Sequence, residues 1–307
     1  MRVAVVDLGT NTTRVLVADV ENGRVEELER RTTVTRLGEG VDANGKLADA
    51  AIERVSKVLA EYREVIDELQ PARVVALATS AVRDAENGSD FRQLLHDRFA
   101  LDVQVIPGEE EARLTFLGAT AARPVGEGPL VVIDIGGGST EYVVGLAGED
   151  PAFRVSTQAG SVRQTERHLD EDPPSGEDLA TVRASVRATI AEAIPPDVRT
   201  QVAAGVAVAG TATSLAAIDQ QLEPYDADRV NGYALRVDAV ERMLAELARV
   251  SLEERRRVPG LHPDRAPTIV AGAAILLESI LLFGLDSVEV SEADILHGAA
   301  LDAADAG

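Results

Sequence analysis

One pattern occurs twice in this sequence. VAVVDLGTNTTRVLV, from Val3 to Val17, aligns with LVVIDIGGGSTEYVV, from Leu130 to Val144, and the alignment places Asp7 on Asp134. Both stretches have an apolar run, an acid, a turn with glycine and hydroxyl residues, and a second apolar run, which is the pattern of a β-hairpin. A chain that repeats such a pattern is expected to fold as two copies of one unit.

The segments that follow the hairpins support this duplication. In each half the hairpin leads into a further strand and then into alternating helices and strands, which is typical of an α/β domain. We expect a first domain over residues 1–125 and a second over 126–293, with a C-terminal helix over about 294–307 that packs back on the first. The turn-rich stretch ARPVGEGP, residues 122–129, reads as the linker. The two hairpins would then line a cleft from opposite sides.

Hydrophobic periodicity gives the expected elements. In the first half these are strands at 3–6, 14–20, 25–35, 73–79 and 103–107, and helices at 47–69, 91–99 and 109–121, with Asp90 as the N-cap of the helix at 91–99. In the second half they are a hairpin at 130–146, strands at 154–157, 202–208 and 287–290, and helices at 161–169, 176–194, 214–219, 237–250, 266–283 and from about 293.

The composition excludes several classes of protein. The 307 residues are 45% hydrophobic and 27% charged, which is typical of a globular chain, and they contain no cysteine, so disulfides, thiolate metal sites and a cysteine nucleophile are excluded. No apolar run approaches the ~18 residues of a membrane span, and no leader pattern precedes the first strand. We expect a cytoplasmic protein.

The net charge of -22 argues against a broad surface for nucleic acid or for an anionic membrane. Lys46 and Lys57 are the only lysines, so nearly all positive charge is arginine, which can contact phosphate with two parallel hydrogen bonds. A protein this acidic that handles a polyanion would need its arginines and a cation gathered in one site.

DIGGGSTE, residues 134–141, is the most specific string. Three glycines, Gly136–Gly138, would let backbone N–H groups converge on an anion, and Ser139 would add a hydroxyl donor. Asp134 ends a buried apolar strand, where a carboxylate is costly unless it binds a cation or hydrogen-bond donors, and Glu141 lies on the returning strand. The alternative is a glycine-rich turn with a capping acid, but the recurrence of the pattern at Asp7 favours a ligand site.

GEEEARL, residues 108–114, opens a helix with three carboxylates. Acids in a first turn stabilise any helix through its dipole, which is the plain interpretation. Beside a phosphate loop, one carboxylate could instead align an attacking water. The adjacent Glu110 and Glu111 cannot both face inward.

Two further stretches could contact phosphate. VAVAGTATSLAAI, residues 206–218, reads as a strand, a glycine turn and a helix N-terminus, which is either an anion site at Gly210 and Thr211 or an ordinary turn. Arg83 follows a strand in TSAVRDAENG and is either a phosphate contact or a surface arginine. The four histidines show no metal-ligand spacing.

Together these strings resemble the exopolyphosphatase/guanosine pentaphosphate phosphatase family, within the actin–sugar kinase–heat-shock chaperone superfamily. The resemblance implies an α/β fold with two duplicated actin-like (ribonuclease H-like) domains that face each other across a cleft. The matching strings, in the order of the family, are AVVDLGTNTTRVLVADV, ATSAVRDAENG, VIPGEEEARLTFLGA, LVVIDIGGGSTEYVVG, GSVRQTERHL, VAVAGTATSLAA and VSEADILHGAAL.

The resemblance also implies residue roles. Glu111 would be the catalytic carboxylate, and Asp134 and Glu141 would hold Mg²⁺, or Mn²⁺, and help to place the water. The residues implied in phosphate binding are Asp7, Gly9, Thr10, Asn11, Thr12, Arg83, Gly136, Gly137, Gly138, Ser139, Gly210 and Thr211.

The chain departs from the family pattern in two places. Arg265-Ala266-Pro267 stands where the family usually has Arg-Ala-Asp, and ILHGAAL, residues 295–301, where many members have an Arg-Glu-Gly variant. Longer members continue into all-helical domains, so the chain resembles a short, two-domain form. We expect it to prefer short polyphosphates and to release intermediates.

The expected function is Mg²⁺-dependent exopolyphosphatase activity, the hydrolysis of the terminal phosphoanhydride of inorganic polyphosphate. Hydrolysis of guanosine pentaphosphate at the 5′ terminal phosphate is the alternative. Two other classes share the scaffold: a small-molecule kinase, for which GTATS is the only candidate nucleotide pocket, and a non-catalytic nucleotide or alarmone sensor, or an actin-like assembler. A homodimer is expected, with no nucleic acid or membrane as partner.

Overall fold

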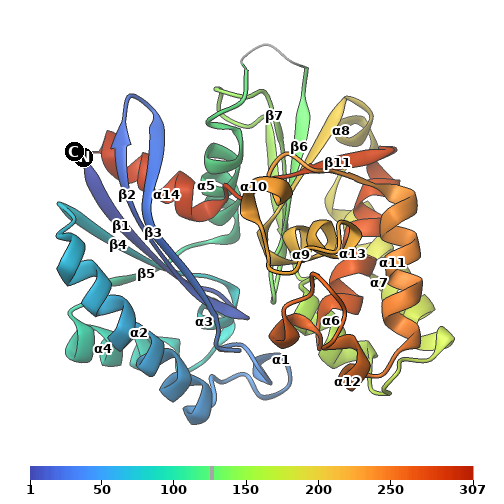
Figure 1. Cartoon of the computed structure of the whole chain (residues 1–307), viewed down its shortest axis with the longest axis horizontal. Helices are drawn as coiled ribbons and strands as arrows, with labels where there is room; N and C mark the ends of the chain where they lie inside the picture. Colours follow the sequence, from blue (N-terminus) through green and yellow to red (C-terminus); the bar gives the residue numbers. More distant parts are fainter. Residues whose placement is uncertain (125–127, 307) are drawn as a thin grey trace. The chain divides into compact units, whose positions relative to one another are not determined.

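The computed structural model describes residues 1–124 and 128–306, and its chain divides into two compact units (Figure 1). Unit 1 comprises Met1–Ala122 and Asp294–Gly307, and unit 2 comprises Arg123–Ala293. The boundary expected between residues 125 and 126 lies outside the described residues. In the described ranges, no helix combines the length and the hydrophobicity that a membrane crossing requires.

Unit 1 is built on a sheet that has five strands in the described part of the chain, in the order β3-β2-β1-β4-β5. The strands β1, β2 and β3 form an antiparallel meander, whereas β4 and β5 run parallel to β1. Successive β1 residues alternate between two hydrophobic cores, one on each face of the sheet. The strand bounds are β1 (Arg2–Leu8), β2 (Thr12–Glu21), β3 (Arg24–Val34), β4 (Arg73–Ala78) and β5 (Val103–Val105).

Helices cover both faces of this sheet (Figure 1). Apolar side chains of α2 and α4 pack on one face, and those of α5 and α14 pack on the other. The helix bounds in unit 1 are α1 (Val41–Asn44), α2 (Asp49–Leu69), α3 (Ser80–Asp84), α4 (Gly88–Phe99), α5 (Gly108–Thr120) and α14 (Ile295–Asp305).

The expected N-cap of α4 was wrong. The helix begins at Gly88 with Asn87 as its N-cap, so Asp90 lies within the first turn. The Asn87 amide accepts from the N–H of Leu47 at 2.9 Å and donates to its carbonyl at 3.0 Å. These two long-range hydrogen bonds hold Asn87 in place before the helix. The helix therefore begins earlier than the local sequence pattern indicates.

Unit 2 repeats the arrangement. Its sheet has six strands in the described residues, in the order β10-β11-β9-β6-β7-β8. As in unit 1, the first strand of the hairpin, β6, pairs antiparallel with β7 and parallel with the strand on its other side, β9. The strand bounds are β6 (Leu130–Ile135), β7 (Thr140–Gly145), β8 (Phe153–Thr157), β9 (Ala204–Val208), β10 (Ala234–Arg236) and β11 (Ser287–Val290).

The core of unit 2 contains the long apolar helix α13. Its single acid, Glu278, is fully buried, and Arg183 and Arg187 of α7 donate to it at 2.6 and 2.7 Å. A buried carboxylate needs such partners, because an unpaired charge in the interior is strongly destabilising. The helix bounds are α6 (Ser161–His168), α7 (Gly176–Ala193), α8 (Pro196–Thr200), α9 (Ala209–Asp219), α10 (Ala227–Val230), α11 (Val237–Arg249), α12 (Leu252–Arg255), the 3₁₀ helix η1 (Pro263–Arg265) and α13 (Ile269–Phe283).

The predicted start of α9 was also wrong. The helix was expected from Ser214, after a turn, but it begins at Ala209, directly after β9. Ala209 has a φ of +62°, a left-handed conformation that turns the chain within one residue from strand to helix. The GTATS segment, residues 210–214, is therefore the first part of the helix.

Candidate active site

The loops of the two hairpins have the same backbone geometry. The N–H of Gly9 donates to the carbonyl of Thr12 at 3.0 Å, and the N–H of Gly136 donates to the carbonyl of Ser139 at the same distance. A Cβ atom would lie 3.0 Å from the Thr12 carbonyl oxygen at Gly9, and 3.1 Å from the Ser139 carbonyl oxygen at Gly136. The first loop position is glycine in both copies because the chain returns too closely for a side chain.

The carbonyl groups of the second loop point at the N-terminus of α6. The Gly136 carbonyl accepts from the N–H of Ser161 at 2.9 Å, and the Gly137 carbonyl accepts from the N–H of Val162, also at 2.9 Å. The Gly138 carbonyl accepts from Nε of Arg163 at 2.8 Å. In a planar trans peptide the N–H points away from the carbonyl oxygen, so the N–H groups of residues 137–139 turn away from α6. Successive backbone N–H groups of this kind are the donors that bind anions in glycine-rich loops.

The carbonyl groups of the first loop also accept hydrogen bonds from a neighbouring segment, although the partners differ. The carbonyl of Thr10 accepts from the N–H of Gly38 at 2.8 Å, and the carbonyl of Asn11 accepts from the N–H groups of Thr35 and Arg36 at 3.0 and 2.9 Å. By the same peptide geometry, the N–H groups of residues 11 and 12 point away from this segment. Both predicted phosphate loops therefore present backbone donors.

In unit 2 two acids face each other beside the loop. Asp134 of β6 lies directly opposite Glu141 of β7, so both side chains lie on one face of the sheet. They are 7% and 1% exposed. Ser156, the next residue in the same row on β8, donates its hydroxyl to Oε1 of Glu141 at 2.6 Å. Two neighbouring buried carboxylates repel each other and lose hydration, which a cation between them would offset.

This donor set fits Mg²⁺. Magnesium takes oxygen ligands and is typically held by one or two carboxylates, while waters and substrate phosphates fill its other positions. In the part of the chain that the structure describes, no group of three or more acids and histidines is placed to hold a metal ion. Asp134 and Glu141 thus match a shared magnesium site and do not match an all-protein metal cage.

In unit 1 the equivalent cross-strand pair is an acid and a base. Asp7 of β1 lies opposite Arg14 of β2, whose Nε donates to Oδ2 of Asp7 at 2.8 Å. The same guanidinium donates to the carboxylate of Asp294, at the start of α14. Burial raises the pKa of Asp7, although Arg14 acts in the opposite direction. Burial acts on Asp294 too, but Arg14 and other nearby cations outweigh it and lower the pKa of that carboxyl.

The acidic first turn of α5 has one buried carboxylate. Glu111 is 8% exposed, and its Oε2 accepts from Nη1 of Arg83 at 3.3 Å. That nitrogen also donates to the carbonyl of Ile106 at 2.8 Å, which fixes the guanidinium against unit 1. Glu110 instead pairs with Arg113 at 2.7 Å, and Glu109 is exposed. The structure therefore brings Arg83 and Glu111 together.

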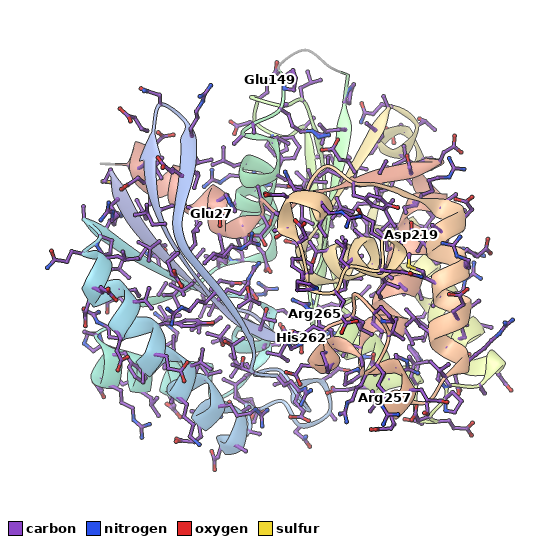
Figure 2. The ribbon with its side chains drawn as sticks, in the orientation of Figure 1. Glu27, Glu149, Asp219, Arg257, His262 and Arg265 are labelled. Carbon is purple, nitrogen blue, oxygen red and sulfur yellow. The ribbon has the colours of Figure 1, made fainter. Side chains whose placement is uncertain are left out.

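Gly210 and Thr211 lie in the first turn of α9. Arg265, labelled in Figure 2, lies with its guanidinium against Gly210, where a Cβ atom would be 1.7 Å from Nη1 of the arginine. Thr211 is buried, and its side chain contacts Gly272 of α13. A cation thus lies against the predicted anion site at Gly210, whereas the Thr211 side chain faces the interior.

Sequence reasoning missed several of these contacts. Four residues that were not identified as part of the site touch predicted site residues, and a fifth, Asp294, touches one of these four; the four are Arg14, Arg163, Ser156 and Arg265. Local patterns contain no signal for most of them, since their partners are far along the chain. Only Arg14 could have been found, because the repeat places it at the position that Glu141 occupies in the second hairpin.

A repeated α/β unit, with an acid at the end of its first strand and a loop of outward backbone donors, defines a phosphate-handling protein of the duplicated actin-like class. The sequence profile of the Ppx/GppA phosphatase family matches residues 16–306. The chain belongs to the Ppx/GppA phosphatase family. The family and the fold class predicted from the sequence are thereby confirmed.

Individual relatives match over nearly their whole length. Exopolyphosphatase 2 of Mycobacterium tuberculosis is 36% identical over 326 residues, covering 99% of this chain and 98% of the relative. The crystal structure of an exopolyphosphatase-like protein is 33% identical with a TM-score of 0.93, covering 100% of this chain and 99% of that one. The structure of the Aquifex aeolicus family member is 31% identical with a TM-score of 0.84, covering 100% and 98%.

Proposed function

We propose that this protein is an exopolyphosphatase, a metal-dependent hydrolase that releases phosphate from the end of inorganic polyphosphate. The observation that carries the proposal is the buried Asp134–Glu141 pair beside the outward N–H groups of residues 137–139. A cation site next to a phosphate loop suits a polyanionic substrate on a chain of net charge -22. The extended similarity to a relative named exopolyphosphatase supports the same substrate.

We assign the second hairpin to the metal and to phosphate. Asp134 and Glu141 would hold Mg²⁺, or Mn²⁺ in its place, and Ser156 would orient Glu141. When bound, the ion would neutralise charge on the phosphate oxygens during the reaction. The N–H groups of residues 137–139, with the Ser139 hydroxyl, would donate to phosphate oxygens, which stabilises the charge that develops as the phosphorus is attacked.

We assign Glu111 to the attacking water. A carboxylate that accepts a hydrogen bond from water aligns it for in-line attack and takes its proton. The water oxygen forms a bond to the terminal phosphorus, the bridging P–O bond breaks, and the products are phosphate and a chain shorter by one unit. Arg83 is held beside Glu111 and would contact the same phosphate. Asp7 and residues 9–12 of the first loop, and Gly210 with Thr211, stay proposed phosphate-binding positions.

Phosphate release from purified protein tests the proposal. Polyphosphate, guanosine pentaphosphate and ATP are compared at equal concentration, and polyphosphate should be hydrolysed fastest. Glu111→Gln should lower kcat by ~10²-fold or more. Glu110→Gln is the matched control, because its pairing with Arg113 lies outside the proposed chemistry.

Each other outcome assigns a different function. Faster hydrolysis of guanosine pentaphosphate would make this protein a guanosine pentaphosphate phosphohydrolase. Transfer of the ATP phosphate to a small molecule would make it a kinase, and binding without turnover would make it a sensor. Equal small losses of kcat in Glu111→Gln and Glu110→Gln would mean that the acidic first turn of α5 only stabilises the helix. The homodimer, the cytoplasmic location and the preference for short chains stay predictions.

A further inference from the structure

Asp294 connects helix α14 to the first hairpin of unit 1. It is the N-cap of α14, and its Oδ1 accepts from the N–H of Leu296 at 3.0 Å. Its other oxygen, Oδ2, accepts from Nη1 of Arg14 on β2. The side chain is 1% exposed. Both carboxylate oxygens are therefore engaged, one by the helix and one by the hairpin.

Through Arg14 this contact reaches Asp7. The guanidinium contacts Oδ2 of Asp7 with both Nε and Nη2, at 2.8 and 2.7 Å, and its third nitrogen is held by Asp294. Asp7 is 2% exposed, and its Oδ1 is buried with no hydrogen-bond partner in the described residues. A buried acceptor without a donor is costly, so this oxygen lacks a hydrogen bond that a bound ligand or water would supply.

The same helix also fixes the element that carries Glu111. α14 crosses α5 at two glycines (Figure 1). A Cβ atom at Gly118 would lie 2.0 Å from the carbonyl oxygen of Asp294, and one at Gly298 would lie 1.8 Å from the carbonyl oxygen of Leu114. The backbones of α14 and α5 are thus in contact at Asp294, the residue that accepts from Arg14. One helix therefore contacts both the guanidinium that is bonded to Asp7 and the helix that carries Glu111.

Capping alone does not account for an aspartate here. Ser175 and Ser251 cap α7 and α12 with a neutral hydroxyl, and each belongs to a complete capping box. Serine, asparagine and aspartate cap helices about equally well. A charged cap at a site this buried adds a desolvation cost, which needs a partner such as Arg14 to offset it.

We propose that Asp294 is a positioning residue for phosphoanhydride hydrolysis, which holds Arg14 so that Asp7 keeps one carboxylate oxygen directed at the bound substrate or its water. The proposal rests on the proposed function for its kinetic test. It concerns a residue outside both hairpins, at the far end of the chain from Asp7.

Asp294→Asn tests it kinetically. Asparagine keeps the cap and loses the charge, so α14 should persist while Arg14 is released. Loss of a residue that orients a site group typically costs ~10–100-fold, and we expect a loss of this size in kcat with little change in KM. The control is Ala304→Gly, near the end of α14, which weakens the helix without touching the charge network. A wild-type kcat in Asp294→Asn, or an equal loss in the control, overturns the proposal.

A second readout does not depend on turnover. The carboxyl carbon of Asp7 is followed by ¹³C NMR as the pH is varied. Asp294→Asn removes a charge that raises the pKa of Asp7, but the release of Arg14 removes a larger influence that lowers it, so the pKa of Asp7 should rise. A lowered or unchanged Asp7 pKa would mean that Arg14 keeps its place and overturns the link, even if polyphosphate proves not to be the substrate. An inactive wild-type protein with a raised Asp7 pKa in the variant refutes the proposed function and supports the link.

A second variant covers the case in which Asp294→Asn does not fold. Arg14→Lys keeps the charge but replaces a planar fork with a single ammonium, which cannot hold two carboxylates in the same way. The same fall in kcat is expected, and wild-type kcat in Arg14→Lys overturns the proposal.

Discussion

The two hairpins share a loop geometry but differ in charge. In both, the first loop glycine donates to the carbonyl three residues later, and an acid is the next-to-last residue of the first strand. The residue opposite that acid is Arg14 in unit 1 and Glu141 in unit 2. The first hairpin therefore carries its own cation, whereas the second pairs two buried carboxylates, which is the arrangement on which the proposed metal site rests.

One side-chain position thus distinguishes the two copies, and it underlies the different roles proposed for them. The guanidinium of Arg14 occupies in unit 1 the role that Mg²⁺ would have in unit 2, so we place the metal in the second hairpin only. The backbone donors are common to both loops because they depend on peptide geometry and on glycine. The two copies therefore share their backbone donors and differ in the charge beside them.

The largest effect is expected on the metal. Glu141→Gln removes a proposed ligand, so the Mg²⁺ concentration for half-maximal activity should rise by more than the ~10–100-fold that is typical of losing an outer partner. Activity is measured against Mg²⁺ concentration after treatment with a chelator. Asp7→Asn is the comparison, because it should change kcat and leave the Mg²⁺ requirement as it is. Full activity in excess chelator would refute the metal site.

A smaller effect on the metal should follow from Ser156→Ala. The Ser156 hydroxyl donates to Glu141 and would orient it. Loss of this hydrogen bond should lower the affinity for Mg²⁺ by about tenfold, the lower end of the effect that is typical of losing an outer partner. Thr32 is the matched control, since it lies opposite Arg14 on β3 as Ser156 lies opposite Glu141 on β8, and it is exposed. If Thr32→Ala changed the Mg²⁺ requirement equally, the two hairpins would not differ as described.

The shared backbone should respond equally in both copies. Gly9→Ala and Gly136→Ala place a methyl group about 3 Å from a carbonyl oxygen, and each should lower the free energy of unfolding by about 1 kcal/mol, the lower end for overpacking. Urea denaturation measures this. Gly176→Ala, in open space at the start of α7, should be neutral or stabilising. A clear difference between the two loop variants would show that the copies have diverged in backbone too.

The smallest effect is expected at the outer end of the charge network of unit 1. Glu27 accepts from Nε2 of His297 at 2.8 Å, and this hydrogen bond lowers the pKa of Glu27 below its ordinary value of 4.5 (Figure 2). Its ionised form therefore stabilises the fold above that value, and the contribution is lost as the pH falls through the lowered pKa. Glu27→Gln should cost about 0.5 kcal/mol at pH 7, since the pair is partly exposed, and nothing in strong acid. A cost that persists in acid would mean a packing role.

The sequence predicted what local patterns encode. The repeat, the two α/β halves, the glycine loops and the acidic first turn of α5 follow from periodicity and from glycine and acid placement. The contact between Arg14 and Asp294 spans 280 positions, and neither residue carries a local sign of the other. The contact of Arg265 with Gly210 likewise has no local sign in the sequence of either residue. The early start of α9 depends on a strained Ala209, which strand and helix propensities disfavour.

The return of α14 to unit 1 also sets an order of events during synthesis. The ribosome delivers Asp7, Arg14 and Glu111 first, then all of unit 2, and only then Asp294 and α14. Until α14 emerges, the sheet face that contains Val3 and Val5 has no cover from it, and Arg14 has no second carboxylate to hold it. The first unit of a growing chain therefore lacks its last helix for as long as the second unit is being made.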